Sequence, residues 1–509
     1  MLATVIGQLA GLARSVIVAR TFGASPELSA FLYGNRVSET LFLLVAGGAL
    51  GSAFIPTFTG FLAKDDKDSA WKLAASLARL VTLTLSLLAL LAAFLAPQIV
   101  RYLLAPGFSS DPALFALTVD LMRIQLIASV LFGLGGLIVG VLNAHHIFLV
   151  PALTPAMYQL GIIFGALVLA PTMGVHGLAW GVVIGAVLYL LIQIPSLLKL
   201  QTDYWSLITS HLSFDSNVRH VLLLMGPRLL GVAVVQVNFW VNAALASKMS
   251  GASMAALSYA FALMLMAQAA IAQSVANAAM PTFSAQHALG QRDEMRASLA
   301  ASLRGIIFLA LPASLGLILL REPLVAMLYQ RGEFDSQSTS LVAWALLWYA
   351  AGLLGHSIME VLTRAFYAQH DTKTPVLIGT VAMGLNVVFS FAFAALFPRF
   401  GWEALGGLAL ANSLATAIEA TVLFIVMRRR LEGIEGGHIA RGFVQAAAGG
   451  LGMSLALAMW NQVGGGLNRW VVGLGGVALG GFVYGIALIL LRVPELQSVI
   501  GFVKRRLGR

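Results

Sequence analysis

The 509-residue sequence contains no cysteine, and only 10% of its residues are charged. Without cysteine the chain has no disulfide framework, no thiolate metal site and no cysteine nucleophile. An ordinary soluble domain carries roughly 25% charged residues, because a largely apolar surface drives association. With 59% hydrophobic residues and a mean hydropathy of +0.89, the chain does not fit a soluble enzyme, a nucleic-acid-binding protein or a disordered scaffold.

Long apolar runs occupy most of the chain. A helix needs about 20 mostly apolar residues to cross a bilayer. We identify fourteen such runs, at 2–22, 29–62, 70–97, 112–143, 148–171, 174–198, 218–247, 252–284, 297–320, 338–368, 374–397, 402–429, 439–460 and 468–492. They are continuous and lack the alternation of a membrane β-barrel. The predicted fold class is an all-α integral membrane protein with about fourteen transmembrane helices.

The basic residues indicate orientation. If the N-terminus is cytoplasmic, the cytoplasmic loops and the tail Lys504-Arg505-Arg506 hold most of the loop Lys and Arg residues, as the positive-inside rule requires. Both termini are then cytoplasmic, which needs an even number of spans. The net charge of +10 therefore reflects membrane orientation, and no nucleic-acid partner is expected.

The chain also repeats itself. Ile55-Pro56-Thr57-Phe58 recurs 225 residues later as Met280-Pro281-Thr282-Phe283, and Gly107 and Gly332 share that offset. The repeat predicts an N-lobe over 1–200 (helices 1–6) and a C-lobe over 215–430 (helices 7–12). Residues 436–509 add helices 13 and 14 and a basic cytoplasmic tail. Parallel repeats of this kind commonly enclose a transport site that opens alternately to each side.

Ionisable residues inside the spans need a partner, a wet cavity or a route to the membrane surface. Spacings of three or four residues predict local ion pairs, here Arg36–Glu39, Asp120–Arg123 and Glu360–Arg364. Arg79 and Arg304 recur in both copies near the cytoplasmic ends of their spans. We expect both of them to reach the membrane interface by snorkelling.

Arg14, Arg20 and Arg36 differ, because the corresponding positions of the second copy are apolar. The repeated fold therefore does not itself require charge at these positions. Cations beside a central cleft would attract an anion, and a guanidinium group matches phosphate through two parallel hydrogen bonds. Arg14 and Arg36 are thus candidate anion-binding residues. Arg20 lies near the outer end of its span, where an interfacial anchor is the alternative interpretation.

Other polar groups carry weaker signals. Asn242 and Asn386 lie in the second copy, where each is either a helix–helix hydrogen bond or a cation ligand. No zinc spacing, phosphate-binding glycine loop or catalytic triad is present. We therefore expect a protein without enzyme activity and without a cofactor. A monovalent cation or the membrane potential would supply the energy for transport.

Short motifs along nearly the whole chain resemble the MurJ/MviN family of the multidrug/oligosaccharidyl-lipid/polysaccharide exporter superfamily. Each motif is short, but all of them occur in the same order as in the family. They are Gly11-Leu12-Ala13-Arg14, Val18-Ala19-Arg20-Thr21-Phe22-Gly23, Ala53-Phe54-Ile55-Pro56, Ala105-Pro106-Gly107-Phe108, Met225-Gly226-Pro227 and Asp371-Thr372-Lys373-Thr374-Pro375.

The resemblance implies an alternating-access flippase that moves lipid II, or a similar polyprenyl-pyrophosphate glycolipid, from the inner to the outer leaflet for peptidoglycan synthesis. It matches Arg14 to a cavity arginine of the family and Arg36 to a position where a cation is common, so both are expected to contact the pyrophosphate. We add Glu39, which would tune Arg36, and Arg20 as candidate substrate-binding residues, and Asn242 and Asn386 as candidate cation ligands. The expected location is the bacterial inner membrane, where membrane lipids and wall-synthesis proteins are the expected partners.

The chain departs from the family pattern in its cavity charges. Gln8, Ser29, Phe42 and Gly47 stand where the family usually has charged residues, and Asn242 replaces a frequent Asp. Two other functions therefore stay open. A cation-coupled exporter of small amphipathic compounds would need an essential membrane acid, such as Glu39 or Glu360. A non-transporting scaffold of a wall-synthesis complex would tolerate cavity mutations.

Overall fold

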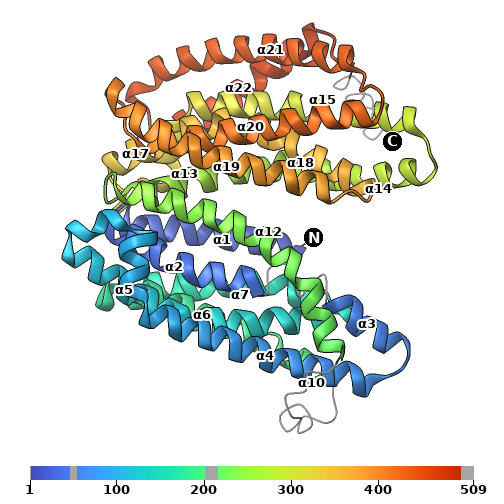
Figure 1. Ribbon diagram of the computed structural model, residues 1–509. Helices are drawn as coiled ribbons and strands as arrows, with labels where there is room; N and C mark the ends of the chain where they lie inside the picture. The colour runs from blue at the N-terminus through green and yellow to red at the C-terminus, as the bar shows by residue number, and fades with distance from the viewer. Residues whose placement is uncertain (1, 46–53, 201–215, 495–509) are drawn as a thin grey trace. The chain divides into compact units, whose positions relative to one another are not determined.

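The computed structural model describes residues 2–45, 54–200 and 216–494, which form helices and turns and contain no strand (Figure 1). The predicted all-α fold class is confirmed. The helices up to residue 247 are α1 (Leu2–Phe22), α2 (Pro26–Val45), α3 (Ile55–Ala63), α4 (Lys67–Phe94), α5 (Ala96–Ile99), α6 (Pro112–Ala144), α7 (Leu149–Phe164), α8 (Ala170–Met173), α9 (Val175–Leu191), α10 (Ile194–Leu200) and α12 (Ser216–Ser247).

The later helices follow the same pattern of long spans and short turns. They are α13 (Ser253–Gln268), α14 (Ser274–Ala288), α15 (Arg292–Leu319), α16 (Arg321–Tyr329), α17 (Ser336–Ala351), α18 (Leu353–Ala368), α19 (Lys373–Leu396), α20 (Leu405–Arg430), α21 (Gly436–Val463) and α22 (Arg469–Leu490). Short π-helical turns, η4 (Gly165–Leu169) and η5 (Ala269–Gln273), join α7 to α8 and α13 to α14.

Ten helical segments of the described residues are long and apolar enough to cross a membrane. The pair α17–α18, bent by 46°, makes an eleventh if it is one span. Three further predicted spans remain: 2–22 corresponds to α1, 218–247 to α12, whose apolar part is Gly231–Ser247, and 29–62 covers α2 and α3, with 46–53 between them outside the described residues. The chain is therefore a multi-pass membrane protein, whereas the total of fourteen spans stays a prediction. The basic tail, 495–509, lies outside the described residues.

The chain divides into two compact units. The N-terminal unit comprises Met1–Ala255 with Arg331–Asp335, and the C-terminal unit comprises Ala256–Gln330 with Ser336–Arg509. In the N-terminal unit, α6 packs against α2, α4 and α9, while α7 packs against α1 and α9. Phe54, Phe58 and Leu85 are fully buried in its core. The lobes predicted over 1–200 and 215–430, and the added segment 436–509, stay a prediction.

Equivalent loops of the two copies make reciprocal contacts inside the N-terminal unit. The Gly107 N–H donates to the Ser247 hydroxyl at the end of α12, over 3.0 Å. The Glu333 N–H, beside Gly332, donates to the Arg20 carbonyl at the end of α1, also over 3.0 Å. A pair of contacts in which each copy offers the same loop to the other's first helix is typical of two-fold pseudosymmetry.

These contacts explain why glycine occupies both loop positions. A Cβ on Gly107 would lie 1.9 Å from the Ser247 oxygen, and one on Gly332 would lie 2.4 Å from the Arg20 oxygen. Gly332 also has a φ of +60°, which L residues rarely adopt. The repeated glycines therefore mark close backbone approaches, and they account for the presence of Arg331–Asp335 in the N-terminal unit.

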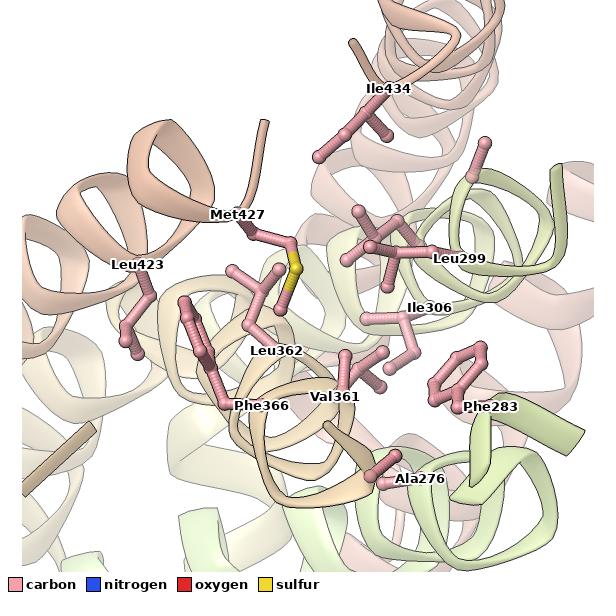
Figure 2. Packing of buried hydrophobic residues seen from close by; sticks show 14 of the residues in the cluster. Ala276, Phe283, Leu299, Ile306, Val361, Leu362, Phe366, Leu423, Met427 and Ile434 are labelled. Carbon is pink, nitrogen blue, oxygen red and sulfur yellow. The ribbon is translucent and has the colours of Figure 1, made fainter. Parts of the chain in front are cut away.

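The C-terminal unit has its own hydrophobic core, in which α14, α15, α18 and α20 meet (Figure 2). Phe283, Leu299, Ile306, Val361 and Phe366 are 0% exposed. Large side chains buried between helices keep these spans together through close packing, because lipid tails provide no hydrophobic driving force for helix association. A second cluster, around Met453, Leu457 and Tyr484, joins α15 to α21 and α22.

The three predicted ion pairs are confirmed. The pair Arg36–Glu39 has a 3.0 Å nitrogen–oxygen distance, Glu360–Arg364 has 3.0 Å and Asp120–Arg123 has 3.8 Å. The prediction for Arg304 is wrong. Its side chain is buried, and Nη1 donates to the His438 carbonyl over 3.1 Å, because α21 packs over this part of α15.

Candidate functional site

A cavity of about 500 Å³ lies within the N-terminal unit, among the predicted anion-binding residues. Side chains from α1, α2, α6, α7 and α9 line it. The lining residues combine one guanidinium, one carboxylate and several hydroxyl groups with apolar and aromatic walls. They are Arg14, Asn35, Ser38, Glu39, Phe42, Leu43, Phe132, Val139, Pro151, Thr154, Pro155, Tyr158 and Tyr189.

Arg14 is the cation that lines this cavity. It projects from the middle of α1, the helix that packs against α7, and its side chain is partly buried. A guanidinium group at bilayer depth is costly unless it faces water or an anion. The cavity gives Arg14 open space beside a few hydroxyl groups, and its guanidinium is therefore available to an anionic ligand.

Arg36 lies one turn before Glu39 on α2. Its ion pair with Glu39, which lines the cavity, connects Arg36 to the same site. Arg36 Nη1 lies 3.0 Å from Glu39 Oε2, and the guanidinium lies 5.1 Å from the ring centroid of Phe239. The Arg36 side chain is 19% exposed, whereas that of Glu39 is 43% exposed. Arg36 Nε is buried without a hydrogen-bond partner among the described residues. Glu39 and Phe239 thus hold Arg36 in position, and its Nε–H group could still donate a hydrogen bond to a ligand.

Part of the cavity lining is aromatic. Phe132 is the centre of this part: its ring packs edge-to-face on Tyr158 at 5.0 Å and on Tyr189 at 5.3 Å, and it lies 5.4 Å from Phe42. Gly135 leaves room for the Tyr189 ring, since a Cβ there would lie 2.4 Å from the ring. Rigid aromatic faces with hydroxyl groups suit contacts with both apolar and hydroxylated ligands.

The other predicted residues lie elsewhere. Arg20 ends α1 with an exposed side chain, does not line the cavity, and accepts the Glu333 N–H through its carbonyl. Asn242 Nδ2 donates to the Asn238 carbonyl over 2.9 Å on α12, in the N-terminal unit. Asn386 is buried on α19, in the C-terminal unit. The substrate role of Arg20 and the cation role of the two asparagines stay predictions.

Several residues that line the cavity were not predicted from the sequence. Asn35, Ser38 and Thr154 are small polar residues that occur in many buried helix contacts, so nothing in the sequence distinguishes them. Tyr158 and Tyr189 could have been recognised as candidate site residues, because a tyrosine hydroxyl inside an apolar span needs a polar partner or water. Within the described ranges, no group of three His, Asp or Glu side chains could hold a metal ion.

The arrangement favours binding over bond-breaking chemistry. The Arg14 guanidinium, the Arg36–Glu39 ion pair and the aromatic hydroxyl groups can together hold a negatively charged group and a polar, hydroxylated neighbour. Three of the helical segments that line the cavity, Pro112–Ala144, Leu149–Met173 and Val175–Leu200, are long and apolar enough to cross a membrane. The site therefore resembles a binding chamber with largely apolar walls and a few polar groups inside a membrane protein.

The family comparison covers most of the chain. The model of the family described as "Lipid II flippase MurJ" matches residues 18–474. A lipid II flippase MurJ of Burkholderia cenocepacia is 31% identical over 430 residues, covering 84% of this chain and 82% of that protein. A probable lipid II flippase MurJ of Haemophilus influenzae is 26% identical and covers 97% of this chain and 98% of its own length.

Solved structures share the fold. A lipid II flippase MurJ in an inward closed conformation superposes with a TM-score of 0.80 at 24% identity, covering 96% of this chain and 98% of the other. An inward-facing multidrug resistance MATE transporter of the MOP superfamily has a TM-score of 0.70 at 17% identity, covering 84% and 94%. From the match over residues 18–474 and the 31% identical relative, we conclude that the chain belongs to the lipid II flippase MurJ family.

Proposed function

We propose that this protein is a flippase that moves lipid II, or a closely similar polyprenyl-pyrophosphate glycolipid, from the inner to the outer leaflet of the bacterial inner membrane. Its family membership supports the substrate class. The observation that carries the proposal is the intramembrane cavity lined by Arg14, which pairs a cation with hydroxyl groups. The protein would act as a transporter in peptidoglycan synthesis and not as an enzyme.

In this proposal, Arg14 binds the pyrophosphate. Its guanidinium offers two parallel N–H donors to a phosphate group, and a charge-assisted hydrogen bond is worth roughly twice a neutral one. Arg36 is the second donor, and Glu39 holds it and moderates its charge. Tyr158 and Tyr189 are suited to contact the sugars through their hydroxyl groups and rings. Arg20, exposed at the end of α1, would meet the substrate only outside the cavity.

Directional movement needs an energy source that binding alone does not supply. We propose that a monovalent cation gradient or the membrane potential drives the transport cycle, with Asn242 and Asn386 as candidate cation ligands. Wall-synthesis proteins that make or consume the glycolipid are the expected neighbours, and both termini are expected in the cytoplasm. The site would open alternately to each side of the membrane, as it does in transporters with parallel repeats.

The test is an Arg14→Ala variant in a bacterium depleted of its own lipid II flippase. We expect outer-leaflet labelling of lipid II to fall at least tenfold, since a hydrogen bond to a charged group is worth about 1.5–3 kcal/mol and 1.4 kcal/mol is tenfold. Arg14→Lys should keep part of the activity. Arg101→Ala, outside the cavity, is the matched control. Undiminished labelling in Arg14→Ala at equal protein levels would refute the proposed role.

Glu39 favours one alternative, a cation-coupled exporter of small amphipathic compounds, because this carboxylate lines the cavity and is 43% exposed. An exporter of that kind needs a membrane acid that binds and releases a cation during each cycle. It predicts that Glu39→Gln abolishes resistance to amphipathic drugs while outer-leaflet lipid II is unaffected. Loss of lipid II labelling in the same variant, without a change in drug resistance, would contradict it.

A further inference from the structure

A second cavity, of about 690 Å³, lies in the C-terminal unit where four span ends meet. α15 and α21 end there, α17 and α22 begin there, and α16 connects α15 to the following turn. Because spans end at the membrane boundary, this cavity lies at the level of lipid headgroups. Its lining residues are Leu319, Arg321, Glu322, Pro323, Ala326, Gln330, Ser336, Thr339, Ser340, Ala458, Asn461, Gly464, Leu467, Arg469 and Val472.

Two guanidinium groups of this cavity are held by main-chain oxygens. Arg321 Nη1 donates to the Ile318 carbonyl over 2.8 Å, and Arg469 Nη1 donates to the Gln330 carbonyl. A guanidinium group carries five N–H donors in a fixed plane, so most of the donors of Arg321 and Arg469 remain for a ligand. Anchored arginines lose little side-chain entropy when they bind, which favours phosphate recognition.

Asn461 offers an acceptor. Its Nδ2 donates to the Leu319 carbonyl at the end of α15 over 2.8 Å. Its Oδ1 is buried and has no hydrogen-bond partner in the part of the chain that the structure describes. A buried acceptor without a donor destabilises a fold, so a ligand hydroxyl that donates to it would be favoured.

The charges and the surrounding surface match a lipid. With Arg321, Arg469 and Glu322, the lining carries one net positive charge, which complements one phosphodiester. Beyond Leu467, apolar side chains continue along α22: Val471 is 49% exposed and Leu474 is 56% exposed. Trp470, 42% exposed, lies at the start of that helix, in the position that interfacial aromatic residues favour.

We infer that this cavity binds the headgroup of an anionic glycerophospholipid, which belongs to the outer leaflet if the N-terminus is cytoplasmic as the sequence predicts. Arg321 and Arg469 bind the phosphodiester, a hydroxyl of the headgroup donates to Asn461 Oδ1, and the acyl chains lie along α21 and α22. A glycerol headgroup provides both the single negative charge and the hydroxyl. The bound lipid joins the ends of four spans and stabilises the C-terminal unit. This site is distinct from the Arg14 cavity, which lies in the other unit, and does not depend on the transported substrate.

Binding can be measured on the purified full-length protein in detergent, by thermal unfolding and native mass spectrometry with added short-chain lipids. We expect phosphatidylglycerol to raise the unfolding midpoint, and phosphatidylcholine and inorganic phosphate at equal concentration to leave it unchanged. The double variant Arg321→Gln, Arg469→Gln should bind phosphatidylglycerol at least tenfold more weakly. Arg399→Gln, which alters an arginine outside this cavity, should bind as the unaltered protein does.

Phosphatidylmethanol isolates the contribution of Asn461, because it has the same phosphodiester but no headgroup hydroxyl. The unaltered protein should prefer phosphatidylglycerol severalfold, and Asn461→Leu should bind both lipids equally. If the double variant fails to fold, Arg469→Gln alone, at an exposed position, tests the same phosphate contact. Equal phosphatidylglycerol binding by the arginine variants, or equal stabilisation by inorganic phosphate, would overturn the proposal.

Discussion

Gly161→Ala is a substitution for which the structure predicts a large local effect. α7 with its extension η4, and α9, meet through glycines of both helices, which are Gly161, Gly165, Gly177, Gly181 and Gly185. Such small residues allow two membrane helices to approach at backbone contact. A Cβ on Gly161 would lie 2.2 Å from the Cα and the nitrogen of Gly185, whereas ordinary contact begins at 3.4 Å. The two helices would therefore have to separate by about 1 Å.

The expected magnitude follows from two opposing effects. Overpacking against backbone that cannot rotate away costs about 3 kcal/mol, the upper end of the usual range. Replacing glycine by alanine inside a helix stabilises it by about 1 kcal/mol. The net loss for Gly161→Ala is thus about 2 kcal/mol of unfolding free energy. Gly316→Ala in α15 is the matched control, because nothing lies within 4 Å of its added Cβ, and it should be neutral or stabilising.

The measurement is a denaturant titration of both variants in the same detergent, followed by helical circular dichroism. Tyr158 and Tyr189, on the same two helices, line the N-terminal cavity, so lipid II transport should also fall in Gly161→Ala and not in Gly316→Ala. If Gly161→Ala proves as stable as Gly316→Ala, the backbone contact between α7 and α9 is not as close as the structure indicates, and the reasoning fails.

Two further predictions concern polar contacts at helix starts. Ser29→Ala should lower the unfolding free energy by about 1–2 kcal/mol, because the buried Ser29 hydroxyl accepts the Ala255 N–H in the first turn of α13 over 3.2 Å. Thr421→Ala, which removes an exposed hydroxyl bonded within its own helix, is the control, and equal losses would contradict this role. Asp371→Asn should flatten the pH dependence of the thermal midpoint at acid pH. Hydrogen bonds from Thr374, and then from Arg430, lower the pKa of Asp371 to about 2. The carboxylate therefore stabilises the fold above its unfolded pKa of about 3.9, and that contribution is lost as the pH falls to about 2. Identical midpoints for both proteins between pH 5 and pH 2 would refute this.

Most of the described helices lie where the sequence has long apolar runs. A bilayer requires every backbone polar group to be satisfied within its own segment, so a long apolar run has few alternatives to a helix. Local ion pairs such as Arg36–Glu39 were predictable for a similar reason, because helical periodicity alone places residues three apart side by side. The glycines at 107 and 332 were visible as a repeat, although the sequence did not reveal what they contact.

The site was only partly predictable. Arg14 and Glu39 were identified from their charge inside apolar spans, and both line the cavity. The burial of Arg304 under α21 was not foreseen, because helical periodicity gives no information about which distant helix will cover a residue.

The sequence by itself therefore determined the membrane class, the positions of most of the described helices, the internal repeat and the few charges that need a polar environment. These properties depend on composition and on neighbours within one turn of helix. Only the tertiary structure decided which faces of the helices meet. That choice placed Tyr158 and Tyr189 around Phe132 beside Arg14, and gathered Arg321, Asn461 and Arg469 around a second cavity. Such contacts join residues far apart in the chain, and close packing between helices selects them.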